Sequence, residues 1–177
     1  SVPDTVRVEN VGDSADGKIT MDSSETVKIV PDMAKIVFAV TSEAKKADEC
    51  QQKNTEALNS LTEYLKGQGI DEKSITTSGY SLNPRYDRSS DTRKLIGYEM
   101  QTEVTVSDVT VEQVGTLLSG GVNAGANEIY SVSYYSSGYD DAYAEALKKA
   151  VELARTKAQA LAEASGRTLG DVVSIEE

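Results

Sequence analysis

The stretch YDDAYAEALKKAVELARTKAQALAEAS, residues 139–165, decides the fold because its apolar residues recur at spacings of three and four. This periodicity predicts one long amphipathic helix. Asp140 and Asp141 supply an N-cap and negative charge at the positive end of the helix dipole, and Gly166 is expected to end the helix in a left-handed conformation. The predicted buried face comprises Tyr143, Leu147, Ala150, Val151, Ala154, Ala158, Leu161 and Ala162. Because this face is rich in alanine, we expect a rod roughly 40 Å long that lies close against a sheet.

The rest of the chain alternates between strand and helix patterns. Period-two segments predict strands over 19–21 with 27–30, 33–41, 75–82, 95–106, 128–135 and 171–175, and helical spacing predicts helices over 43–66 and after a capping box at 110–113. Residues 33–135 then read β-α-β-β-α-β, which suggests a ferredoxin-like core. The expected class is α+β: a mixed, mainly antiparallel sheet with helices packed on one face, plus the long C-terminal helix.

Two boundaries complete the domain prediction. Residues 1–18 are acidic and rich in Gly, Ser and Asp, so we expect a flexible N-terminal arm, with a short strand around Thr5–Val8 as the alternative. Residues 19–177 are expected to form a single domain, since a chain of 177 residues has the length of one. Gly120-Gly121 is expected to end the short helix, and Asn83–Lys94 to form a polar loop.

Composition restricts the chemistry that the chain can perform. There is no histidine, which excludes the usual Ser-His-Asp triad, the Cys-His dyad and every zinc site that contains histidine. The single Cys50 excludes an internal disulfide and is interpreted as a buried small apolar residue rather than a reactive thiol. A net charge of -11 disfavours nucleic acid and anionic membrane surfaces as partners. We expect no catalytic residues, no cofactor and no metal.

Several segments in order resemble the SIMPL-domain family, which is found largely in bacterial envelope and exported proteins. They are Ile19–Asp22 with Val27–Ala34, Leu65–Ile70, Thr77–Tyr86, Gly97-Tyr98, Ala124–Ile129, Ala144–Gly166 and Leu169–Ile175. The resemblance covers most of the chain from Ile19 to Ile175. Each motif is weak alone, and their order and spacing carry the likeness.

The resemblance implies a location outside the cytoplasm (cell envelope, periplasm or secreted), a link to envelope integrity or tolerance of oxidative stress, and assembly of some members as oligomers. It supplies no catalytic residue. The chain departs from the family at Ser23 and Glu25, where glycines are usual, and members tend to continue into a further strand beyond the position of Glu177. We therefore expect either a trimmed chain or a sheet edge that something else covers. Ser1 is compatible with a removed leader.

Tyrosine is the unusual enrichment, with nine Tyr against one Phe and no Trp. Tyrosines offer contact area with a polar tip, although rings that simply pack on the sheet are the favoured interpretation. Basic residues gather in Asn83–Lys94, which makes this segment the candidate binding loop. The candidate partner-binding residues are Tyr80, Arg85, Tyr86, Arg88, Arg93 and Tyr98.

The leading functional hypothesis is a non-enzymatic exported domain that works by contact, through self-association or an envelope protein. One alternative is a small-molecule-binding module with a pocket between the long helix and the sheet. The second is an enzyme that uses carboxylates or tyrosine, which the lack of histidine disfavours.

Overall fold

A computed structural model describes residues 6–11, 17–87, 89 and 93–177. Its strands are β1 (Val6–Val11), β2 (Lys18–Ser23), β3 (Met33–Ala44), β4 (Ile75–Asp87), β5 (Lys94–Thr110), β6 (Glu128–Tyr135) and β7 (Val172–Glu176). Its helices are α1 (Ala47–Gly67), α2 (Val114–Ala124) and α3 (Tyr139–Ala164), with the short 3-10 turns η1 (Glu72–Ser74) and η2 (Val111–Gln113). The chain divides into an end unit, Ser1–Val30 with Ser137–Glu177, and a central unit, Pro31–Ser136.

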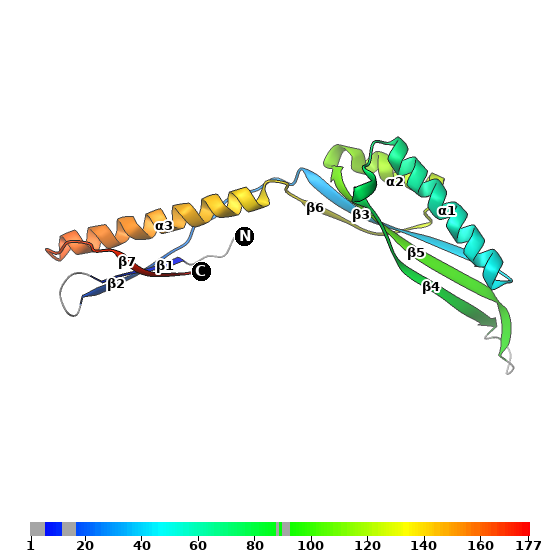
Figure 1. The fold of residues 1–177 in the computed structure, drawn as a ribbon, viewed down its shortest axis with the longest axis horizontal. Coiled ribbons are helices and arrows are strands. Elements are labelled where there is room, and N and C mark those ends of the chain that lie inside the picture. The colour runs from blue at the N-terminus through cyan, green and yellow to red at the C-terminus, as the bar shows by residue number, and fades with distance from the viewer. Residues whose placement is uncertain (1–5, 12–16, 88, 90–92) are drawn as a thin grey trace. The chain divides into compact units, whose positions relative to one another are not determined.

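The central unit is a four-stranded sheet with strand order β4-β5-β3-β6, in which every recorded pairing is antiparallel. Helices α1 and α2 lie on the same face of this sheet (Figure 1). Strand β3 follows the alternation expected from the sequence, because Ala34, Ile36, Phe38 and Val40 are all fully buried or nearly so. The α+β class and the mainly antiparallel pairing are confirmed.

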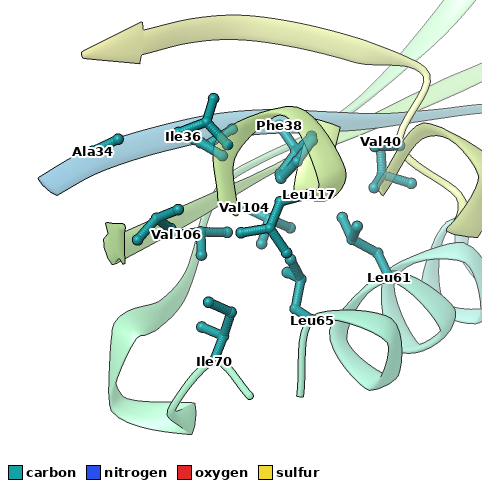
Figure 2. Close-up of a cluster of buried hydrophobic side chains, with 13 residues drawn as sticks. Ala34, Ile36, Phe38, Val40, Leu61, Leu65, Ile70, Val104, Val106 and Leu117 are labelled. Carbon is teal, nitrogen blue, oxygen red and sulfur yellow. The ribbon is translucent and has the colours of Figure 1, made fainter. Parts of the chain in front are cut away.

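The core of the central unit forms where α1 and α2 meet β3 and β5. Figure 2 shows Phe38 and Val104 from the sheet facing Leu117 of α2 and Leu61 and Leu65 of α1. These side chains are at most 1% exposed, so each contributes about 1.5–3 kcal/mol of burial free energy. This shared core joins the elements of the predicted β-α-β-β-α-β segment into one unit.

The end unit contains the three-stranded antiparallel sheet β2-β1-β7, with α3 alongside it (Figure 1). Its helix packs through a row of alanines at four-residue spacing: Ala146, Ala150, Ala154, Ala158 and Ala162. Met21 of β2 contacts this row, and the Ser23 hydroxyl donates to the Ala150 carbonyl oxygen at 2.5 Å. The expected buried face is correct at its alanines and wrong at Leu161, which is 49% exposed, because the close approach admits only small side chains.

The structure confirms the predicted C-terminal end of α3 and corrects its predicted N-cap. Gly166 has φ +68°, and the amides of Gly166 and Arg167 donate to the carbonyls of Glu163 and Ala162, so the left-handed C-cap is confirmed. The N-cap is Gly138, and Asp140 and Asp141 lie inside the first turn. Their negative charges there still interact favourably with the positive end of the helix dipole.

The expectation that Gly120-Gly121 ends the short helix is wrong. Helix α2 continues to Ala124, and Gly125, with φ +137°, follows it. A β-carbon on Gly120 would lie 1.8 Å from the Tyr64 hydroxyl, and one on Gly121 would lie 2.8 Å from the Phe38 ring. The two glycines therefore permit close packing against α1 and the sheet, and this packing outweighs their poor helix propensity.

Strand structure also extends into segments that the sequence assigns differently. Strand β4 runs to Asp87 and β5 starts at Lys94, so Asn83–Asp87 belong to a hairpin and not to a loop. Pro84 is tolerated because β4 is an edge strand. Within the expected N-terminal arm, Val6–Val11 form β1 between β2 and β7, while residues 1–5 and 12–16 lie outside the described residues.

Candidate functional site on the β4–β5 hairpin

Strands β4 and β5 carry four of the six candidate residues, Arg93 directly precedes β5, and Arg88 lies outside the described residues. Tyr80 sits in an irregularity of β4, where the register with β5 shifts between Ser78 and Ser81. The preceding Gly79 has φ +65°, and the Glu103 side chain lies against it. This bulge leaves the Tyr80 side chain 63% exposed.

Arg85 is held by an ion pair with Glu43 at the end of β3. The ion pair crosses β5 at Gly97, because Arg85 is in register with Gly97. A β-carbon on Gly97 would lie 2.7 Å from the Ala44 carbonyl oxygen of β3. Glycine at position 97 therefore allows β3 and β5 to approach closely under the pair. Both partners are about half exposed, so the pair orients Arg85 more than it stabilises the fold.

Tyr86 and Arg93 meet near the hairpin end, where the Arg93 guanidinium carbon lies 4.5 Å from the centre of the Tyr86 ring. This geometry is a cation–π contact. Next to it, the Ser89 hydroxyl and amide donate to Asp87, and these hydrogen bonds lower the pKa of the Asp87 carboxyl. The basic cluster expected from the sequence is thus partly fixed by local contacts.

The hairpin also exposes apolar side chains that the sequence-based analysis did not select. Leu82, Leu95 and Ile96 are 43%, 44% and 52% exposed. Their signal in the sequence is the pair Leu95-Ile96 directly after Arg93-Lys94. Together with Arg93 and Lys94 they form what we call the hairpin surface.

A hollow of about 380 Å³ lies where the hairpin meets the β3–α1 turn, lined by Glu43, Ala44, Lys45, Glu49, Lys53, Arg85, Ile96, Gly97 and Tyr98. It brings together Arg85 and Tyr98 of the predicted residues, whereas Tyr80 and Tyr86 do not line it. Lys45 and Lys53 also line the hollow, although neither is among the candidate partner-binding residues predicted from the sequence. Lys53 donates to the Glu43 carbonyl oxygen at 3.2 Å.

Buried polar contacts fix α1 behind this hollow. The Asn54 amide donates to the carbonyl oxygens of Val40 and Met100, and it accepts from the Thr102 hydroxyl at 2.7 Å. The Cys50 thiol is fully buried and donates to the Ser42 carbonyl oxygen at 3.2 Å. The interpretation of Cys50 as a buried small residue agrees with this position.

At the opposite end of the central unit, Tyr135 of β6 bonds Asp108 in a bulge of β5. The Tyr135 hydroxyl donates to the Asp108 carboxylate at 2.9 Å, and the Asp108 amide donates back to the hydroxyl oxygen at 3.0 Å. Burial of the ring raises the pKa of Tyr135, and the nearby negative Asp108 and Asp32 add to the effect. Asp108 has φ +56°, so this network holds an unusual backbone conformation in place.

The described residues contain no group of three or more His, Cys, Asp or Glu side chains placed to hold a metal ion. Within the same ranges, no helix combines the length and apolar character that crossing a membrane requires.

The fold and the site define an α+β protein with two antiparallel sheets and an exposed hairpin that carries both cations and apolar side chains. The family model SIMPL, described as a protein of unknown function (DUF541), matches residues 19–177. The chain belongs to the SIMPL family.

The chain is also similar to individual bacterial proteins. The 26 kDa periplasmic immunogenic protein of Brucella melitensis biotype 1 is 30% identical over 174 residues, which cover 96% of this chain and 70% of that protein. The uncharacterized protein YggE of Edwardsiella ictaluri is 29% identical over 89% of this chain and 66% of its own length. YggE of Escherichia coli K12 is 32% identical over 65% of this chain and 47% of its own length.

Proposed function

We propose that this chain is a non-enzymatic, exported or cell-envelope protein that acts by contact, through self-association or through another envelope protein. The Brucella relative named as periplasmic supports the location outside the cytoplasm. The lack of histidine supports a role without bond-making chemistry. The family resemblance adds a role in envelope integrity or tolerance of oxidative stress to the proposal.

The hairpin surface is the observation that carries this proposal. Leu95 and Ile96, adjacent in the sequence, and Leu82 on the facing strand are each at least 43% exposed, and exposed apolar side chains on one hairpin favour an interaction site. Arg93 and Lys94 stand beside them in a chain of net charge -11. The local positive charge favours an acidic partner surface, and the chain's own acidic surface meets that description.

A small-molecule-binding module is the second candidate function, because the hollow at the β3–α1 turn has the volume of a ligand pocket. The hollow recorded on the long helix is lined by α3 residues: Arg155, Thr156, Gln159, Ala160 and Glu163. The hollow at the β3–α1 turn lies in the central unit, and it supports a ligand site other than the predicted pocket between the long helix and the sheet. Its lining is mainly charged, which favours a polar ligand.

The test compares two double variants of the full chain. Leu95→Glu/Ile96→Glu replaces the apolar part of the hairpin surface, and Arg93→Glu/Lys94→Glu reverses its charge. Lys148→Glu/Arg155→Glu on α3 is the control for the charge reversal, since it makes the same change in net charge as Arg93→Glu/Lys94→Glu at exposed positions of a helix. Light scattering across the micromolar range and cross-linking to purified envelope fractions measure association.

We expect the association that depends on the hairpin surface to weaken at least tenfold in both hairpin variants and to persist in the control. A wild-type chain that stays strictly monomeric and captures no envelope protein would contradict the proposed function. An equal loss of association in the control would mean that the effect comes from the overall charge and not from the hairpin surface.

A further inference from the structure

We propose that strand β6 pairs antiparallel with β6 of a second copy across a two-fold axis, which joins the two four-stranded sheets into one of eight strands. This inference rests on the self-association arm of the proposed function, and it adds a contact through β6 to the one proposed at the hairpin surface. It commits to a second copy of this chain as the occupant of the edge.

The two edges of the central sheet differ in how they are protected. Edge strand β4 carries devices that discourage pairing: the bulge at Gly79, Pro84 and the charged Arg85. Edge strand β6 contains no charged residue and no proline from Ile129 to Tyr135. Its register irregularity lies at Tyr130, so residues 131–135 form a regular run against β3. Within the central unit, strand β6 is therefore the edge that is less protected against pairing.

Backbone alternation shows which groups of β6 point outward. The Ala39 carbonyl accepts from the Asn127 amide, and both backbone groups of Thr41 bond the Asn127 side chain, so odd-numbered residues of β3 face the β6 side. Their register partners are Ser131, Ser133 and Tyr135. The residues between them, Val132 and Tyr134, then present their N–H and C=O groups at the outer edge.

A two-fold axis at Ser133 matches these free groups. Val132 of one copy then stands opposite Tyr134 of the other, and the two residues exchange backbone hydrogen bonds on each side of the axis. A β-branched residue opposite an aromatic one is a favourable cross-strand pair. Ser133 stands opposite Ser133 of the second copy in a non-hydrogen-bonded pair, which brings their Cα atoms to about 4.5 Å.

Charge and exposure favour β6 as the strand through which two copies approach. Two chains of net charge -11 repel each other, so they approach at least cost where neither presents a charged side chain. Strand β6 offers such a zone from Ile129 to Tyr135. Tyr134 is 53% exposed in the single chain, and the backbone pairing with Val132 of a second copy would cover part of it.

The test uses engineered cysteines in the full chain. Ser133→Cys places a thiol next to its own copy at a separation that suits a disulfide. Ser131→Cys is the matched control on the same strand and face, since its predicted neighbour is Tyr135 of the second copy. Under mild oxidation we expect Ser133→Cys to form a covalent dimer at least tenfold faster than Ser131→Cys, while the buried Cys50 stays unreacted.

A second variant, Tyr134→Pro, removes one outward amide from an exposed position of an edge strand, where proline is tolerated. We expect its mass by light scattering to fall by one association step relative to wild type, with an unchanged circular dichroism spectrum. If this variant unfolds, the ratio of the two cysteine rates alone decides.

Equal cross-linking of the two cysteine variants, or a folded Tyr134→Pro variant of unchanged mass, would overturn the β6 pairing. Association that survives Tyr134→Pro but is lost in Leu95→Glu/Ile96→Glu would overturn this inference and leave the proposed function standing. A wild-type chain without any association would overturn both. Capture of an extended peptide of another protein at β6, without self-cross-linking, would also exclude the second copy.

Discussion

Asn54 shows how one polar residue on an apolar stripe fixes the register of a helix. It has no exposed surface, and it bonds two carbonyl oxygens of β3 and β5 together with the Thr102 hydroxyl. In the sequence, Asn54 falls at helical spacing with Cys50, Ala57 and Leu61, so it is the polar member of an otherwise apolar stripe. It could not identify Thr102 as its partner, because 48 residues separate them and only the packing of α1 on β5 brings them together.

Replacing Asn54 by leucine should destabilise the protein by about 1–3 kcal/mol, because the Thr102 hydroxyl and two carbonyls lose a buried hydrogen-bond partner. The double variant Asn54→Leu/Thr102→Val should recover part of that loss, since it removes the stranded hydroxyl as well. Urea unfolding of the wild type, both single variants and the double variant gives the coupling energy. Strictly additive effects would mean that the recorded hydrogen bond does not contribute.

At the scale of elements, α2 shows why glycine was misleading in the sequence. A Gly-Gly pair within an apolar segment usually ends a helix, yet α2 continues through Gly120 and Gly121. Contacts with Tyr64 and Phe38 decide this, and those residues come from α1 and β3. The hairpin gives the same lesson, since pairing of β4 with β5 overrides the turn signals at Asn83 and Pro84.

Gly121→Ala should lower the free energy of unfolding by about 1–3 kcal/mol, although alanine is the better helix former. Its β-carbon would lie 2.8 Å from the fully buried Phe38 ring, which cannot move freely. Gly115→Ala, in the same helix, is the control, because a β-carbon there meets nothing within 4 Å. Thermal melting should show the control unchanged or stabilised by up to about 1 kcal/mol. A stabilised Gly121→Ala would refute the packing role.

At the scale of the whole molecule, the chain builds two cores of different quality. The central unit is one continuous segment, Pro31–Ser136, with Phe38, Leu61 and Leu65 fully buried. The end unit draws on both ends of the chain, and among the residues whose burial is described its buried apolar cluster consists of Ala150 and Ala154. These two alanines bury less area than the large apolar side chains of the central core.

A fragment of residues 31–136 should therefore fold alone, with a helix and strand content equal to that of the same residues in the full chain. Differential scanning calorimetry of the fragment should show one cooperative transition within a few degrees of the main transition of the full chain. Two variants of the full chain serve as a control for the end unit. Ala154→Leu enlarges a buried side chain of that unit, whereas Ala160→Leu enlarges an exposed one, and their melting curves are compared. A fragment without a cooperative transition would show that the central core depends on the end unit.

Local patterns in the sequence determined much of this protein. Apolar periodicity gave the α+β class, the extent of α3 and the alternation of β3, because the position of a side chain along a helix or strand follows from the backbone repeat alone. Composition alone excluded catalytic and metal sites that depend on histidine. The basic and tyrosine-rich segment identified the hairpin, although not its exposed leucines and isoleucine.

Only the tertiary structure decided which elements share a core. It assigned α3 to the sheet of β1, β2 and β7, kept α2 helical through two glycines, and formed the hollow from Arg85, Tyr98 and two lysines distant in sequence. The physical reason is that burial and close packing depend on contacts between residues far apart along the chain. Such contacts leave no periodic signal in a single sequence.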